Sequence, residues 1–155
     1  MRIGYGYDVH RLKPGRDCIL CGVKIPCAFG PDGHSDADAP VHALIDALLG
    51  AAALGDIGKL FPDTDERFRG ADSIELLKTA YALLRGSGYR LSNADITIIL
   101  EAPRLAGYIG EMRDTLAKAL DVPLGAVSVK ATTEEKLGFT GAGLGISASA
   151  VVLIE

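Results

Sequence analysis

The chain has 155 residues, of which 48% are apolar, and a formal net charge of −4. A chain of this length fits one domain whose core needs no disulfide or structural metal. The acidic balance argues against a nucleic-acid surface, which needs clustered basic side chains. No apolar run approaches the roughly 20 residues of a membrane span, and residues 1–5 already resemble a strand rather than a signal segment. We therefore expect a cytoplasmic protein that binds neither nucleic acid nor membrane.

The first predicted strand covers residues 2–12, where side chains of two kinds alternate. One face bears Ile3, Tyr5, Tyr7 and Val9, and the other bears Gly4, Gly6, Asp8 and His10. Residues two apart in a strand lie about 7 Å apart on the same side, so the carboxylate of Asp8 and the imidazole of His10 can converge on one cation. By itself the pair is more typical of a solvated strand face than of a metal site.

Three cysteines follow, Cys18, Cys21 and Cys27, in a segment that predicts a short hairpin over residues 18–26 with its turn near Cys21 and Gly22. An odd count without an export signal favours reduced thiols. Residues three apart in a strand face opposite sides, so we interpret the C-x-x-C spacing as ordinary strand thiols rather than a metal site. Residues 30–33 are predicted to form a loop that leads to His34.

A helix is predicted over residues 38–54, with Asp38 as its N-cap, Pro40 in the first turn and a glycine stop. Its buried stripe consists of Val41, Leu44, Ile45, Leu48, Leu49 and Ala52. His42 lies beside the stripe, where it is either a partly buried histidine bonded to Asp46 or a metal ligand. Together with the aspartate and histidine of the first strand, His42 completes the three-ligand set of a catalytic zinc site with one open position.

The remaining elements alternate between helices and strands. We predict an irregular loop at 55–65 and an amphipathic helix at 72–87 that bears no candidate functional residue. A strand at 89–100, a helix from 105 or 108 to 120 and a strand at 126–132 follow. The chain then has a glycine-rich loop at 133–145 and a strand at 146–154. This order predicts a single-domain α/β (α+β) sandwich, in which helices pack on one face of a mixed sheet.

Several separate motifs stand at 2–4 with 8–10, 33–36 with 42–44, 48–65, 102–103, 129–133 and 135–141. In this order and spacing the chain resembles the 2-C-methyl-D-erythritol 2,4-cyclodiphosphate synthase family over nearly its whole length. The resemblance implies a homotrimer with active sites between neighbouring subunits. It also implies the reaction: the 2-phosphate of a CDP-methylerythritol 2-phosphate attacks the β-phosphorus, CMP leaves, and an eight-membered cyclic diphosphate forms.

The resemblance also assigns metals and catalytic residues. It implies that Asp8, His10 and His42 bind Zn²⁺, the same set that the spacing indicates. Glu135 would help to hold a second divalent ion, Mg²⁺ or Mn²⁺, on the phosphates of the substrate. His34 and Thr133 would stabilise the charge that spreads over the equatorial oxygens of the pentacoordinate phosphorus.

By the same resemblance the methylerythritol group meets residues around 35–63, and the neighbouring subunit binds cytidine near residues 100–105 and 132. The implied substrate-binding set is Asp8, His10, His34, Ser35, Asp56, Ile57, Gly58, Phe61, Asp63, Asp65, Leu100, Ala102, Pro103, Leu105, Lys130, Thr132, Thr133, Glu135 and Phe139. Lys130 is a candidate phosphate contact, although a strand lysine is as often solvated.

The chain departs from the family pattern at a few positions. Glu134 replaces a common threonine, and Arg104 a common lysine. Ala142 stands where the family often has an arginine that meets an isoprenoid diphosphate in the trimer cavity, and Leu144 replaces a common acid. Losing one charge-assisted hydrogen bond per subunit predicts weak binding of such a ligand.

Two other functions compete with the synthase. A zinc phosphohydrolase would use the same three ligands to activate water, but it needs a general base, for which Asp46 and Asp56 are the nearest candidates. A non-enzymatic trimeric binding protein on a related scaffold is the second rival, because a fold alone does not fix function.

Overall fold

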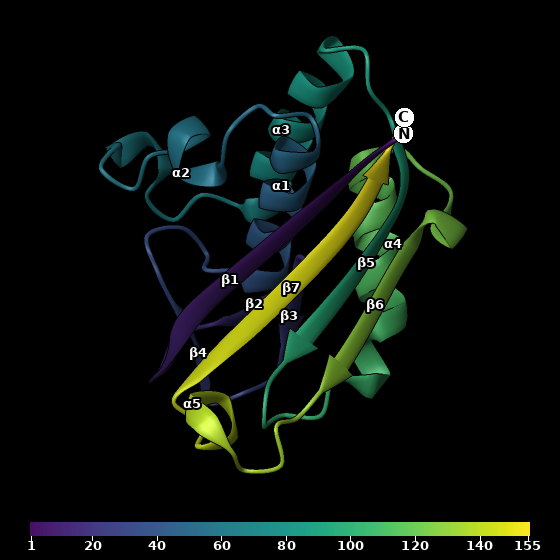
Figure 1. The fold of residues 1–155 in the computed structure, drawn as a ribbon. Helices are drawn as coiled ribbons and strands as arrows, with labels where there is room; N and C mark the ends of the chain where they lie inside the picture. The colour runs from purple at the N-terminus through teal and green to yellow at the C-terminus, as the bar shows by residue number, and fades with distance from the viewer.

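The computed structural model describes all 155 residues and is built around a five-stranded mixed sheet (Figure 1). The strands of this sheet, in the spatial order β4-β1-β7-β5-β6, are β4 Phe29–Asp32, β1 Arg2–Pro14, β7 Gly145–Ile154, β5 Leu91–Ile99 and β6 Val127–Thr132. Only β5 and β6 pair in parallel. A separate hairpin consists of β2 Cys18–Leu20 and β3 Val23–Ile25, as predicted.

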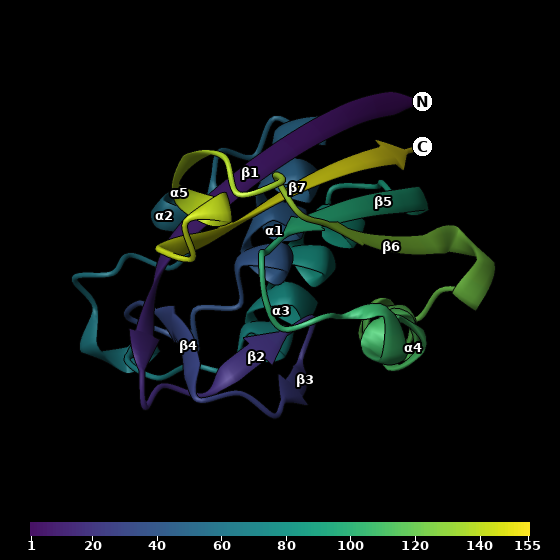
Figure 2. The ribbon, with the colours of Figure 1, turned by 90° about the horizontal axis from the view of Figure 1, so that it is seen from below.

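Three long helices, α1 Ala39–Ala51, α3 Ser73–Gly86 and α4 Ile109–Leu120, lie on one side of the sheet (Figure 2). The shorter helices are α2 Ile57–Leu60 and α5 Gly138–Gly141, and the 3-10 turns are η1 Glu66–Phe68, η2 Ala106–Tyr108 and η3 Leu124–Ala126. The predicted mixed sheet with helices on one face is therefore confirmed. None of the helices has the length and apolarity that a membrane crossing requires.

Helix α1 forms where the sequence predicts it and packs directly on β1. The Asp38 side chain accepts the Val41 N–H as the N-cap, although the helix ends at Ala51 rather than near residue 54. The two elements touch through glycine: a Cβ atom added at Gly4 or Gly6 would lie only 1.9 Å from a carbonyl oxygen of α1. The missing side chains thus let the backbone of the strand rest on the backbone of the helix.

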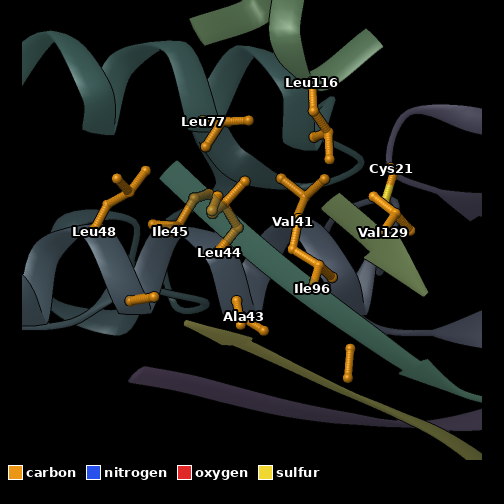
Figure 3. Close-up of a cluster of buried hydrophobic side chains, with 14 of the residues drawn as sticks. Cys21, Val41, Ala43, Leu44, Ile45, Leu48, Leu77, Ile96, Leu116 and Val129 are labelled. Carbon is orange, nitrogen blue, oxygen red and sulfur yellow. The ribbon is translucent and has the colours of Figure 1, made fainter. Parts of the chain in front are cut away.

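The core lies between the sheet and the three helices. It is a continuous cluster of 37 buried residues. Figure 3 shows Leu44, Ile45 and Leu48 following one another along α1, with Leu77 of α3 above them and Ile96 of β5 to the right of Leu44. Burying one such side chain contributes roughly 1.5–3 kcal/mol. The helix that carries His42 is consequently fixed on several sides.

The opposite face of the sheet bears large apolar side chains that nothing in the chain covers. Ile3, Tyr5 and Tyr7 of β1 are 72%, 64% and 49% exposed, and Val9 and Val151 are also exposed. This is the predicted apolar face of the first strand, but it points away from the helices. Monomeric proteins rarely expose contiguous apolar patches of this kind.

Three segments that were predicted as loops contain regular structure. Residues 29–32 form β4, whose position at the sheet edge tolerates Pro31 because the missing N–H has no strand to meet. The 55–65 segment contains α2, which Asp56 caps by accepting the Lys59 N–H. The 133–145 segment contains α5. In each case only a few residues are regular, and such short elements have weak sequence periodicity.

The three cysteines are free thiols, as predicted, but Cys18 and Cys21 are not arranged as the strand spacing suggested. All three are unpaired. Cys18 lies in β2, whereas Cys21 lies in the hairpin turn with a φ of +51°, not in a strand. Both thiols are buried in the apolar core, so the expectation that they face opposite sides is wrong.

Candidate metal and substrate site

Three side chains from two elements bring their ligand atoms together. Asp8 and His10 come from β1 and His42 comes from α1, and one ligand atom from each lies within 4.8 Å of the others. Asp8 Oδ2 is 2.9 Å from His10 Nε2 and 3.2 Å from His42 Nδ1. The two ring nitrogens are 3.2 Å apart. The predicted trio therefore converges on one point.

The hydrogen bonds of His10 determine which of its nitrogens faces this point with a lone pair. Its Nδ1 lies 3.0 Å from the carbonyl oxygen of Asp32. A carbonyl oxygen only accepts, so Nδ1 carries the hydrogen and donates it. Nε2 is then a bare acceptor that faces the carboxylate of Asp8 and the ring of His42. Such a cluster of acceptors at short range fits a bound cation.

One carboxylate oxygen and two imidazole nitrogens are the donor set that suits Zn²⁺ with an open fourth position. The alternative in which His42 is bonded to Asp46 is not observed. Asp46 instead accepts the Ile57 N–H at 2.7 Å and so fixes the start of α2. The donor chemistry of the three side chains therefore fits a divalent cation.

The electrostatics of the cluster favour positive charge. Burial raises the pKa of Asp8, but the hydrogen bonds and charges of His10 and His42 outweigh it and lower that pKa to about 2. Burial lowers the pKa of His10, yet the hydrogen bond that its protonated ring makes to Asp8, the charge of Asp8 and the contact with Asp32 together outweigh burial and raise that pKa above its usual value. Asp8 is thus ionised at any physiological pH and attracts whatever cation approaches.

A cavity of about 460 Å³ opens beside the three ligands. Its walls bring together most of the predicted residues of this part of the chain: Asp8, His10, His34, Ser35, His42, Ile57, Gly58, Phe61 and Asp63, with Gly33, Phe68 and Leu76 as further lining residues. Two predicted residues do not line it. Asp56 caps α2, and the carboxylate of Asp65 is paired with Arg67.

The backbone of Asp65 nevertheless contacts the predicted catalytic histidine. Its carbonyl oxygen lies 3.3 Å from His34 Nε2, which must therefore donate its hydrogen to it. This bond leaves Nδ1 as the nitrogen of His34 that is available to a ligand.

A second cavity of about 350 Å³ lies where β5 and β6 end. Five predicted residues line it, namely Leu100, Pro103, Leu105, Thr132 and Thr133, whereas Ala102 does not. Glu101, Arg104, Ala106, Ile109 and Ala131 complete the walls. Half of these ten residues are apolar, and polar and charged groups are placed among them, a combination typical of small-molecule sites.

Sequence reasoning missed Glu101, which connects this second cavity to the following loop. Its carboxylate accepts a hydrogen bond from the Lys136 ammonium group at 2.7 Å, and this partner lowers the pKa of Glu101. Lys136 belongs to the loop that carries Thr133 and Glu135, whose side chains lie 3.4 Å apart. No local pattern marks Glu101, because its partner lies 35 residues away.

Four other residues singled out from the sequence have different surroundings. Lys130 pairs with Asp95 across the parallel strands, so its ammonium group already has a partner. Phe139 is 42% exposed on α5. Ala142 and Leu144 are exposed and uncharged, so weak binding of isoprenoid diphosphates stays a prediction.

One residue of α3 contacts a proposed metal ligand, although no functional residue was predicted in this helix. Ser73, the first residue of α3, is fully buried, and its Oγ lies 3.0 Å from His42 Nε2. Ser35 Oγ lies 3.1 Å from the same nitrogen. The serine was missed because the contact depends on how α3 docks against α1, which the pattern of α3 alone does not specify.

The two cavities lie at different parts of the sheet. Two of the three ligands, Asp8 and His10, are on β1, and the second cavity lies at the ends of β5 and β6, with β7 between β1 and β5 (Figure 1). Three inter-strand spacings separate β1 from β6, a distance of about 14 Å.

Comparison with known proteins agrees with this geometry. The family model that describes the YgbB family matches residues 1–155. The chain belongs to the YgbB family. It is 61% identical over 154 residues to the 2-C-methyl-D-erythritol 2,4-cyclodiphosphate synthase of Moorella thermoacetica, covering 99% of this chain and 94% of the relative. The protein of the same name from Clostridium perfringens is 58% identical over 154 residues, with 99% of both chains covered.

Solved structures of this YgbB-family fold agree equally well. Two structures of 2C-methyl-D-erythritol-2,4-cyclodiphosphate synthase match with TM-scores of 0.92 and 0.91, at 44% and 43% identity. Each covers 99% of this chain and 100% of the other, and the second is a form bound to CDP. The predicted family and the predicted enzyme class, a lyase that acts on phosphorus–oxygen bonds, are confirmed.

Proposed function

We propose that this chain converts 4-diphosphocytidyl-2-C-methyl-D-erythritol 2-phosphate into 2-C-methyl-D-erythritol 2,4-cyclodiphosphate and CMP, within non-mevalonate isoprenoid biosynthesis. The observation that carries the proposal is the Asp8, His10 and His42 cluster, which opens into a cavity beside His34. The names of the relatives and the CDP-bound structure of one of them support the substrate. A biosynthetic role of this kind agrees with the expected cytoplasmic location.

The proposed metal is one Zn²⁺ per chain at Asp8, His10 and His42, because two imidazoles and a carboxylate are typical zinc ligands. A second ion, Mg²⁺ or Mn²⁺, would use Glu135, since these cations prefer carboxylate and phosphate oxygens. When bound, the cations supply Lewis-acid polarisation of the diphosphate. The open cavity beside the trio offers room for the phosphates.

The chain itself orients the reacting groups. An oxygen of the 2-phosphate attacks the β-phosphorus, the bond from that phosphorus to the bridging oxygen breaks, and CMP leaves with the electron pair. Thr133 would donate to the phosphate oxygens as charge spreads over them. His34, whose Nε2 is bonded to the Asp65 carbonyl, would donate to them from Nδ1 when both of its ring nitrogens carry hydrogen. The attacking oxygen is already ionised, so the reaction needs no general base.

This last point separates the proposal from a zinc hydrolase. A hydrolase would need a free carboxylate or imidazole beside the metal-bound water. Asp46 accepts the Ile57 N–H, and Asp56 accepts the Lys59 N–H. Both candidate bases therefore have other hydrogen-bond partners.

We further propose that the chain forms a homotrimer whose active sites lie between subunits. Two features support a cyclic assembly: the uncovered apolar face of β1 and the distance of about 14 Å between β1, which carries Asp8 and His10, and β6, which borders the second cavity. A closed ring would bury the first and bring the second cavity of one subunit to the metal cavity of the next. The number three comes from the resemblance to the family.

Two measurements test the function. The purified chain, supplied with Zn²⁺, Mg²⁺ and the CDP-methylerythritol 2-phosphate, should release one CMP for each cyclic diphosphate detected by ³¹P NMR. A linear phosphate product would indicate a hydrolase, and stoichiometric zinc without turnover would indicate a binding protein. Light scattering should give a mass of about 49 kDa, three times the 16.2 kDa of one chain.

A further inference from the structure

We propose that Ser73 and Asp36 are positioning residues that hold His42 in the tautomer with a bare Nδ1, the form that can bind a metal ion. The inference rests on the proposed metal site at Asp8, His10 and His42. Ser73 and Asp36 lie outside this trio and act only through the far nitrogen of the His42 ring.

The contacts run from His42 through Ser73 to the carboxylate of Asp36, and this carboxylate determines the direction of the hydrogen bonds. Ser73 places both its backbone N–H and its hydroxyl on the Asp36 carboxylate, the N–H at 2.9 Å. An ionised carboxylate only accepts, so the hydroxyl hydrogen of Ser73 is committed to it. The Oγ lone pairs then face His42 Nε2 at 3.0 Å, and this nitrogen must carry a hydrogen to bond them.

A neutral imidazole carries a single ring hydrogen. With this hydrogen on Nε2 of His42, Nδ1 is a bare lone pair, and Nδ1 is the atom that faces Asp8 Oδ2 and His10 Nε2, each at 3.2 Å. The contact with Ser73 thus prepares His42 for a cation before the cation arrives. Such outer hydrogen bonds commonly fix the tautomer of a ligating histidine.

A competing arrangement exists in the same pocket. Ser35 Oγ lies 3.1 Å from His42 Nε2 and accepts the Ala37 N–H, so its own hydroxyl hydrogen is not committed to a carboxylate. If Ser35 donated to Nε2, the ring hydrogen would move to Nδ1 and bond to Asp8 at 3.2 Å. His42 Nδ1 would then carry the hydrogen and Asp8 Oδ2 would accept it, so neither atom would be free to bind a cation. The Ser73–Asp36 pair opposes this arrangement.

The pair is held rigidly enough to impose a tautomer. Ser73 is fully buried at the first position of α3, behind its N-cap Asp72. Asp36 is fixed through its own backbone, because its N–H donates to the Ala71 carbonyl at 3.1 Å, and its carboxylate accepts the Asp38 N–H at 3.2 Å. The docking of α3 against α1 is in this way part of the metal site.

The test compares Ser73→Ala, Ser35→Ala and Ser87→Ala. Ser87 serves as the control, because it lies next to the far end of α3, and its exposed hydroxyl bonds only to the Leu83 carbonyl. Zinc affinity is measured by competition with a chromophoric chelator. We expect Ser73→Ala to bind zinc about 10–100-fold more weakly, and the other two variants to change by less than about threefold.

The ring tautomer provides a readout that does not depend on the metal. In the zinc-free protein, ¹⁵N NMR of the labelled imidazole should show hydrogen on Nε2 of His42, and Ser73→Ala should move it toward Nδ1. Asp36→Asn tests the same idea without removing the hydroxyl, since an amide can donate to Ser73 Oγ and free the hydroxyl to donate to His42. It should weaken zinc binding in the same direction as Ser73→Ala.

The outcomes separate the two proposals. If the unmodified chain binds no zinc, the proposed metal site is wrong. If it binds zinc but Ser73→Ala and Asp36→Asn bind equally tightly with unchanged ring signals, the metal site stands and the positioning role is wrong. If Ser73→Ala fails to fold, the folded Asp36→Asn variant decides by the same two measurements.

Discussion

Replacing Gly6 by alanine tests whether the metal site depends on the close approach of β1 to α1. The added Cβ would lie 1.9 Å from the Ala43 carbonyl oxygen and 2.8 Å from the Ala47 nitrogen. Cβ atoms in real structures essentially never come closer than 3.0 Å, so strand and helix must separate by about 1.1 Å. Gly6 stands two residues before Asp8, and Ala43 follows His42, so the separation acts at the ligands themselves.

The expected effect is large on metal binding and moderate on folding. Metal–ligand distances tolerate deviations of only about 0.2 Å, so a shift of about 1.1 Å removes His42 from a cation held by Asp8 and His10. We expect zinc affinity to fall at least about 100-fold. Overpacking costs roughly 1–3 kcal/mol, which corresponds to a fall in Tm of roughly 2–12 °C.

Gly50→Ala is the matched control in the same helix. A Cβ at Gly50 has nothing within 4 Å, so this change should raise the unfolding free energy by about 0.5–1 kcal/mol and leave zinc affinity unchanged. Both variants are measured by chelator competition and thermal denaturation at one protein concentration. Gly6→Ala that binds zinc as tightly as the unmodified chain would refute the reasoning.

Three further predictions concern single side chains. His42→Ala should lose zinc and activity while its circular dichroism stays native, because the cluster of 37 core residues does not include His42; stoichiometric zinc in this variant would remove His42 from the ligand set. His34→Ala and Thr133→Ala should keep zinc and lower kcat more than they raise KM, since their bonds strengthen in the transition state; a rise in KM alone would contradict this. Asp38→Asn tests how the stability depends on pH. Burial raises the pKa of Asp38 from 3.8 to about 7. Between about pH 4 and pH 7 the folded chain therefore holds a proton on Asp38 that the unfolded chain has released. The unfolding free energy should therefore fall between about pH 4 and pH 7 by up to about 1.4 kcal/mol per pH unit, and Asp38→Asn should remove this component in denaturant titrations. An identical pH dependence of the two proteins would show that Asp38 stays ionised.

Much of the metal site could be predicted because each ligand has a local pattern. The alternation of the first strand puts Asp8 and His10 on one side, and the stripe of α1 leaves His42 at its margin. The glycines of β1, which pack directly on the backbone of α1, then bring the three together. The convergence of these side chains follows from short-range rules.

The parts that could not be predicted depend on contacts between distant segments. Ser73 looks like an ordinary helix start until α3 docks against His42, 31 residues earlier in the sequence. Glu101 reaches Lys136 only because the loop after β6 folds back on the end of β5. Pro31 argues against a strand unless the strand lies at an edge, and edge position is a property of the whole sheet.

The most direct test of the composite site mixes two inactive variants. His34→Ala and Thr133→Ala are co-expressed so that they assemble randomly, and CMP release is measured with each variant alone as control. If every site takes His34 from one subunit and Thr133 from its neighbour, about one quarter of all sites in the randomly assembled mixture have both residues, and activity should return to about 25% of the unmodified enzyme. If both residues come from the same chain, every site keeps a defect, and the mixture stays as inactive as its components.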